Sequence, residues 1–156
     1  MAGDPRATYD ERLWPPWWLW VVGWLFAASL AISFHAALGP GWGLLALLLP
    51  GGLLSWVLLS SAAPVRVQDG ELVAGRAHIP VEHLARAQPL DAERSRAVRG
   101  PEADPAAYHL IRGWVPAGVR LEVTDPADPT PYWFVATRHP QDLAAAVEAA
   151  RARRAG

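Results

Sequence analysis

The residues of this sequence with the greatest potential for chemistry are its five histidines. Two of them, His78 and His83, flank Glu82 and could be ligands of a metal ion. Zinc needs three or four ligands in a fixed geometry, and residues five positions apart on a strand point to opposite faces. His109 and His139 could join such a site only through space. The spacing therefore predicts no metal site and no cofactor.

Other catalytic motifs are absent from the sequence. Without cysteine, the chain has no thiol nucleophile, disulfide or zinc–thiolate site. It also lacks a glycine-rich phosphate loop, a nucleophile elbow and the paired histidines of zinc proteases. Asp125 and Asp128 are spaced loosely like calcium ligands, but each adjoins a proline, where aspartate favours a turn. We therefore expect a non-enzyme, although a cluster of His78, His83 and His109 around one pocket would favour an enzyme.

Arg138 and His139 lie just before the predicted C-terminal helix. The free N–H groups at the start of a helix can bind an anion, which would suggest recognition of a lipid headgroup or a phosphopeptide. The alternative is that Thr137 or His139 serves as an ordinary helix cap.

The longest uncharged stretch of the sequence predicts where the chain lies in the cell. No Asp, Glu, Lys or Arg occurs between Arg12 and Arg66, so 53 consecutive residues are uncharged, while the other 103 carry all 29 charges. A bilayer core about 30 Å thick needs roughly 20 residues of helix. The stretch therefore fits two membrane spans joined by a short turn. It is also too long for the apolar region of a cleaved signal peptide, about 7–15 residues.

Proline and glycine predict where the two spans begin and end. The one strong turn signal inside the stretch is Leu38-Gly39-Pro40-Gly41, and Pro15-Pro16 suits a helix start. The chain is thereby divided into three parts: a cytosolic N-terminal segment at 1–14, a transmembrane helical hairpin at 15–63 with helices at about 16–38 and 42–62 and a turn at 39–41, and a cytosolic α+β domain at 64–156.

The positions of arginine predict the orientation of the hairpin. Arg6 and Arg12 precede it, Arg66 and Arg76 follow it, and the turn has none. The positive-inside rule then places both termini in the cytoplasm, with the lipid bilayer of the inner (plasma) membrane as one partner. Tryptophans crowd the start of the first span, as in an aromatic belt at the membrane interface: Trp14, Trp17, Trp18, Trp20 and Trp24.

Several residues within the spans could have a role. Gly23, Ala27, Ala31 and His35 recur every four residues, so they share a face on which helices could pack closely, within the hairpin or in a homo- or hetero-oligomer. His35 is the only titratable residue of the spans; packing near the outer turn and a proton or ligand role both remain open. Pro50-Gly51-Gly52 predicts a kink, which in a transporter could mark a substrate site.

Short alternating runs follow Pro64 and predict β-strands. Asp69-Gly70 between two runs is a strong hairpin signal, and Asp91 and Gly100 fit the ends of a short helix. Three prolines within 125–131 predict a loop. The predicted strands are 65–68, 71–74, 77–80 and on to about 90, 108–112, 119–124 and 132–137, and a helix begins at Pro140.

This order of elements predicts the fold class of the cytosolic domain. Leu143, Val147 and Ala150 give the last helix an apolar side. Antiparallel strands followed by one such helix suggest an antiparallel sheet or split barrel with a C-terminal capping helix, as in a pleckstrin-homology-like (PH-like) barrel. From Arg66 onward, 12 Arg balance 12 Asp and Glu, so we expect no nucleic-acid partner.

Three stretches carry a resemblance that covers nearly the whole chain. They are Tyr9-Asp10-Glu11-Arg12-Leu13 before a Trp-rich span, Gly100 to Ala106, and Thr124 to Trp133 followed by Thr137-Arg138-His139-Pro140. In these the sequence resembles the actinobacterial DUF3093 family, small two-pass membrane proteins of unknown function. The resemblance implies two spans and a cytosolic domain, and it implies no catalytic residues.

Three hypotheses for function follow. The first is a non-enzymatic, membrane-anchored interaction or scaffold module whose cytosolic domain binds a protein partner or headgroups. The second, motivated by Pro50 and His35, is an accessory subunit of a larger membrane complex such as a transporter. The third is an enzyme.

Overall fold

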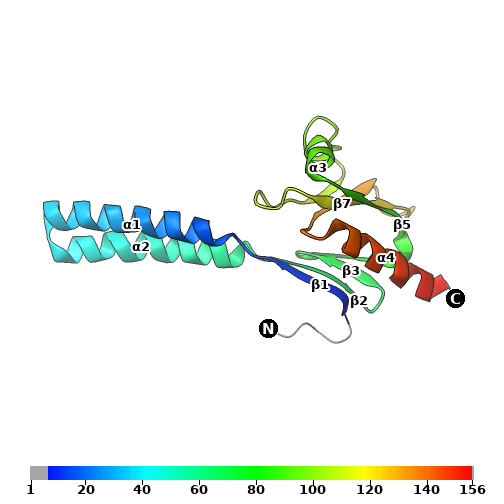
Figure 1. Ribbon diagram of the computed structural model, residues 1–156, viewed down its shortest axis with the longest axis horizontal. Coiled ribbons are helices and arrows are strands. Elements are labelled where there is room, and N and C mark those ends of the chain that lie inside the picture. Colours follow the sequence, from blue (N-terminus) through cyan, green and yellow to red (C-terminus); the bar gives the residue numbers. More distant parts are fainter. Residues whose placement is uncertain (1–6, 156) are drawn as a thin grey trace. The chain divides into compact units, whose positions relative to one another are not determined.

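The computed structural model describes residues 7–155 and divides the chain into two compact units (Figure 1). One unit is helical and consists of Trp14–Ala62. The other is an α+β unit formed by the chain up to Leu13 and from Ala63 onward. Of the arginines used to predict orientation, Arg6 lies outside the described residues.

The helical unit contains α1 (Trp17–Leu38) and α2 (Pro40–Ser60). The predicted helices are confirmed, but the turn is shorter than expected, because Gly39 alone separates them. Gly39 has φ 95°, which a side chain would disfavour. Pro40 can begin α2 because the first turn of a helix needs no N–H partner there.

The residues predicted to kink the second helix do not divide it into two elements. The helix α2 continues through Pro50, Gly51 and Gly52 as one element (Figure 1). Proline removes one backbone hydrogen bond from the ladder, and the neighbouring bonds still hold the helix. Ser55 Oγ donates to the Gly51 carbonyl oxygen at 2.8 Å, so one carbonyl near the proline gains a side-chain partner.

The first sheet of the α+β unit has the order β1-β2-β3-β4 and is antiparallel throughout. The turn Asp69-Gly70 joins β2 to β3 with positive φ at both residues, as the sequence predicted for this hairpin. The strands are β1 (Ala7–Leu13), β2 (Ala63–Gln68), β3 (Glu71–Ala74) and β4 (Ala77–Pro80).

Strand β1 was not expected, because residues 1–14 were predicted to be a separate segment. Instead it pairs with β2 along its whole length, from Ala7 opposite Gln68 to Leu13 opposite Ala63. Leu13 is fully buried, while Asp10 and Arg12 are exposed, so β1 alternates as a strand with one buried face. The helical unit is therefore an insertion, along the chain, between two paired strands.

The second sheet has the order β5-β7-β8-β6. Its strands β7 and β8 are antiparallel and flank the predicted loop at 125–131, but β6 pairs parallel to β8, which departs from the expected antiparallel sheet. The helix α3 (Ala92–Arg99) has Asp91 as its N-cap, as predicted. The remaining elements are the 3-10 helix η1 (Val81–His83), β5 (Leu84–Leu90), β6 (Tyr108–Leu110), β7 (Gly118–Val123) and β8 (Tyr132–Ala136).

The C-terminal helix α4 (Pro140–Ala155) packs against strands of both sheets (Figure 1). Leu143 and Val147 are fully buried and Ala150 nearly so, which matches the predicted apolar side. These side chains join one hydrophobic core with inward residues of both sheets, including Val65, Val67, Leu72, Leu84, Val119, Leu121 and Val135. The apolar face of α4 therefore packs against both sheets and holds them together.

Candidate functional site

The start of α4 lies beside a buried polar cluster centred on Glu11 of β1. Only 10% of the Glu11 side chain is exposed, and Thr137, just after β8, is fully buried. Tyr9 lies two residues before Glu11 on the same face of β1. We call Tyr9, Glu11, Thr137 and Arg138 the Glu11 cluster.

The hydrogen bonds of the Glu11 cluster use both carboxylate oxygens. Thr137 Oγ1 donates to Glu11 Oε2 at 2.5 Å, and the Tyr9 hydroxyl donates to the same oxygen at 2.8 Å. The backbone N–H of Arg138 donates to Glu11 Oε1 at 3.2 Å, and Arg138 Nη1 lies 3.6 Å from that oxygen. Thr137 Oγ1 also accepts the His139 N–H at 3.0 Å.

This geometry bears on the anion site considered for Arg138 and His139. The carboxylate that meets the backbone N–H of Arg138 belongs to the chain itself, so Glu11 occupies this approach to α4. The His139 side chain is exposed and lies 3.9 Å from Asp142 of its own helix. The cluster therefore joins β1 to the start of α4, and the Thr137 hydroxyl accepts the His139 N–H just before the helix.

Burial raises the pKa of Tyr9 far above its ordinary value, and the neighbouring Glu11 carboxylate adds to the rise. The hydrogen bond with Thr137 acts in the opposite direction on this pKa. Tyr9 therefore remains protonated and acts as a hydrogen-bond donor, not as a base or nucleophile.

The raised pKa of Tyr9 predicts a pH dependence of stability. The pKa of tyrosine in an unfolded chain is about 10, so above that pH Tyr9 loses its proton in the unfolded chain and keeps it in the folded chain. The stabilisation is therefore complete below about pH 10 and declines as the pH rises toward the folded pKa. We expect Tyr9→Phe to flatten part of this alkaline decline, measured by urea unfolding at several pH values. Burial also raises the pKa of Tyr108, so part of the alkaline decline in stability should remain in Tyr9→Phe. Tyr108→Phe is the matched control.

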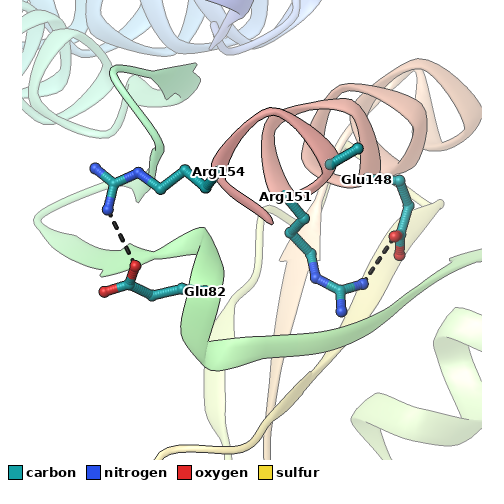
Figure 2. Close-up of a pocket in the computed structure, with 5 residues that line it drawn as sticks. Glu82, Glu148, Arg151 and Arg154 are labelled. Atoms are coloured by element: carbon teal, nitrogen blue, oxygen red, sulfur yellow. Dashed lines mark hydrogen bonds and ion pairs between the residues drawn. The ribbon is translucent and has the colours of Figure 1, made fainter. Parts of the chain in front are cut away.

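A second polar site lies near the end of α4, where a cavity of about 410 Å³ is lined by Glu82, Glu148, Arg151, Ala152 and Arg154 (Figure 2). Arg154 Nη1 is 3.1 Å from Glu82 Oε2, and Arg151 Nη1 is 2.8 Å from Glu148 Oε2. Figure 2 shows the two pairs on separate sides of the cavity. Each arginine thus has an acidic partner, and the four charges cancel.

The ion pairs of this cavity connect α4 to its neighbours. Glu148 Oε1 accepts the Ala87 backbone N–H at 3.2 Å, where β5 has an irregular register. Arg154 Nη2 donates to the Asp69 carbonyl oxygen at 3.2 Å. Because these side chains are at least one-third exposed, each pair contributes about 0–1 kcal/mol. These contacts attach α4 to the neighbouring elements. The residues that line the cavity include no nucleophile activated by a base.

The small residues predicted on one face of α1 lie against α2. Ala27 is buried, and a Cβ added to Gly23 would overlap the Leu54 side chain. A Cβ on Gly43 would lie 2.7 Å from His35 Cβ and 3.0 Å from the Ala31 carbonyl oxygen. Gly23, Ala27, Ala31 and His35 therefore lie along the contact between the two helices.

His35 itself is exposed at the edge of an apolar groove of about 360 Å³. The groove is lined by Ala31, Ile32, His35, Gly43, Leu44 and Leu47. Within residues 7–155, no hydrogen bond of the His35 ring to another side chain is found.

The residues considered as metal ligands are not brought together. His78 lies on β4 and His83 in η1, so the assumption that both lie on one strand was wrong. No group of three His, Asp or Glu residues suited to a metal occurs among the described residues. Asp125 and Asp128 each accept a backbone N–H two residues ahead, from Ala127 and Thr130, at 2.9 Å, as expected for turns.

Sequence reasoning missed the Glu11 cluster. No role was predicted for Glu11, because its partners Thr137 and Arg138 lie more than 120 positions away along the chain. The alternation of Tyr9, Glu11 and Leu13 was the available signal, since it marks one face of a strand.

Comparison with protein-family models places the chain in a family. The family model described as "Protein of unknown function (DUF3093)" matches residues 8–147. No curated protein and no solved structure matches the chain.

Proposed function

We propose that this chain, which belongs to the DUF3093 family of proteins of unknown function, is a two-pass membrane protein with a non-enzymatic interaction module on the cytoplasmic side. The observation that carries the proposal is the uncharged stretch, which forms two long helices with no polar face. The inner (plasma) membrane is the compartment that we propose.

The length and exposure of the helices support membrane insertion. The helices have 22 and 21 residues, enough for a bilayer core about 30 Å thick at about 1.5 Å per residue. In their most apolar windows, only 6% and 17% of the residues are buried inside the structure, whereas the core helix of a soluble protein is mostly buried. Large apolar side chains are exposed on both helices, among them Trp17, Leu25, Phe26, Ile32, Leu49, Leu53 and Trp56. Lipid would cover this surface.

The distribution of charge supports a cytoplasmic α+β unit. Arg12 precedes α1, and Arg66 and Arg76 follow α2, while the connection at Gly39 carries no charge. Under the positive-inside rule this places both strands that flank the hairpin in the cytoplasm. Trp42 near the start of α2 and Trp56 near its end fit the two membrane interfaces.

The architecture of the α+β unit supports a binding module of the PH-like kind. Two four-stranded sheets packed against a C-terminal helix agree with that comparison, whereas the parallel strand β6 departs from it. The Glu11 cluster favours a structural role over a catalytic one, because its hydroxyl, carboxylate and backbone groups bond to each other.

The proposed interaction role is tested by cross-linking in native membranes, followed by purification in a mild detergent. A photo-reactive residue at exposed Glu93 of α3 is expected to capture one discrete protein, or headgroup lipid, in a constant ratio. The same residue at Gly52 of α2, which has open space around it, is the matched control for the hairpin. Absence of any specific product at Glu93 and at other exposed positions of the α+β unit would contradict the role.

A second candidate is an accessory subunit of a larger membrane complex. The exposed His35 beside the groove of α1 and α2 favours it, because an intramembrane titratable group commonly has a functional partner. Specific cross-links from Ile32 to another membrane protein would support this candidate, and a strictly monomeric species in native membranes would contradict it.

A further inference from the structure

One face of the second sheet carries two arginine guanidinium groups and an imidazole around two aromatic rings. Phe134 of β8 is paired with Arg120 of β7 on one side and with His109 of β6 on the other. Directly paired residues project from the same face of a sheet, and so does Tyr132, two residues before Phe134. We call His109, Arg120, Tyr132 and Phe134 the Tyr132 face.

The rings hold the cationic groups in place. The guanidinium carbon of Arg120 lies 4.2 Å from the centre of the Tyr132 ring. That of Arg99, from α3, lies 5.6 Å from the centre of the Phe134 ring. The His109 ring is 5.8 Å from Tyr132 and 6.3 Å from Phe134, centre to centre. Such contacts attract a guanidinium to the face of an aromatic ring and restrict its position.

Neither Arg120 nor Arg99 has an acidic partner in the part of the chain that the structure describes. The ion pairs found there involve other arginines, namely Arg66, Arg94, Arg138, Arg151 and Arg154. Arg99 donates to two backbone carbonyl oxygens, those of Ser95 and Pro116. Half-buried Arg120 has the ring contact alone. A half-buried charge without a counter-charge is costly, so an anion from outside the chain would stabilise it.

Unpartnered nitrogen atoms mark the same place. Arg120 Nε and His109 Nε2 are buried and have no hydrogen-bond partner among the described residues. His109 Nδ1 lies 3.1 Å from the Ala107 carbonyl oxygen and donates to it, so in that tautomer Nε2 is an acceptor and the unpartnered donor is Arg120 Nε. Buried polar groups in folded proteins are almost always paired, and an unpaired group calls for an explanation.

We propose that the Tyr132 face binds a phosphate-class oxyanion, with the Arg120 guanidinium as its principal ligand and Arg99 as a second positive charge. Phosphate fits better than a carboxylate, because two guanidinium groups offer more donors than two oxygens accept. The anion is either the phosphate of a lipid headgroup or a soluble phosphate ester. This inference does not depend on the proposed membrane role, since every residue in it belongs to the α+β unit.

The test uses the full chain in nanodiscs of phosphatidylcholine and measures the unfolding temperature. Inorganic phosphate or glycerol phosphate, added at constant ionic strength against chloride, is expected to raise this temperature in a saturable way. Arg120→Gln should weaken the apparent affinity by about tenfold or more, because a charge-assisted hydrogen bond is lost. Arg86→Gln is the matched control, since Arg86 is an exposed arginine of β5 in the same sheet.

A parallel measurement in nanodiscs of phosphatidylglycerol distinguishes the sources of phosphate. If the unfolding temperature is higher in phosphatidylglycerol and no longer responds to added phosphate, the ligand is the lipid headgroup. If the unfolding temperature responds to glycerol phosphate but not to phosphatidylglycerol, the ligand is a soluble ester. Equal responses to phosphate and glutamate, or equal affinities in the Arg120→Gln and Arg86→Gln variants, would overturn the proposal. If Arg120→Gln fails to fold, the wild type decides: no saturable response to either phosphate source also overturns it.

Discussion

Glu11→Ala is expected to lower the free energy of unfolding of the α+β unit by about 3–5 kcal/mol. The substitution removes the acceptor for the Tyr9 hydroxyl, the Thr137 hydroxyl and the Arg138 backbone N–H at once. Thr137 is fully buried, so water cannot replace the lost bond there without a rearrangement. The change is measured by pulse proteolysis in urea on the detergent-solubilised chain.

Asp10→Ala is the matched control for this prediction. Asp10 is the neighbouring acidic residue on β1 and pairs with Arg66 at 2.9 Å, but both side chains are partly exposed. Such a surface pair contributes about 0–1 kcal/mol. If Glu11→Ala costs no more than Asp10→Ala, the Glu11 cluster does not join β1 to α4 in the way described.

Gly43→Leu is expected to force α1 and α2 apart. The new Cβ would lie 2.7 Å from His35 Cβ and 3.0 Å from the Ala31 carbonyl oxygen, and backbone atoms cannot move aside as a flexible side chain can. Overpacking of this kind costs about 1–3 kcal/mol or more. We expect faster proteolysis of the hairpin and a lower unfolding temperature in detergent.

Gly52→Leu tests whether the Gly43 effect comes from helix contact. Gly52 lies in the same helix, and no atom lies within 4 Å of a Cβ added there. This variant should retain the wild-type unfolding temperature within the accuracy of the measurement. Equal losses in the two variants would show that glycine matters for α2 itself and not for its contact with α1.

Local patterns were sufficient to predict much of the fold. Asp69-Gly70 predicted its hairpin because the pair adopts positive φ, and Asp91 predicted a helix start because its side chain accepts the Arg94 N–H. The alternating residues of β7 and the apolar side of α4 depend equally on near neighbours along the chain. These features require no knowledge of distant partners.

Elements that depend on distant partners could not be predicted in this way. Strand β1 pairs with residues on the far side of the helical insertion, so its charged sequence looked like a flank of the first span. The parallel pairing of β6 with β8 is set by strand order, not by the sequence of Tyr108–Leu110. The Glu11 cluster and the Tyr132 face both arise from such pairings, which explains why neither was predicted.

The central claim, a membrane hairpin with a cytoplasmic α+β unit, is tested most directly by single-cysteine labelling, because the chain has no cysteine of its own. Gly41→Cys lies beside the connection of the two helices, and Glu93→Cys is exposed on α3. With a membrane-impermeant maleimide, intact cells should label Gly41→Cys and leave Glu93→Cys unlabelled until the membrane is permeabilised. Labelling of Glu93→Cys in intact cells, or of Gly41→Cys only after permeabilisation, would contradict the account.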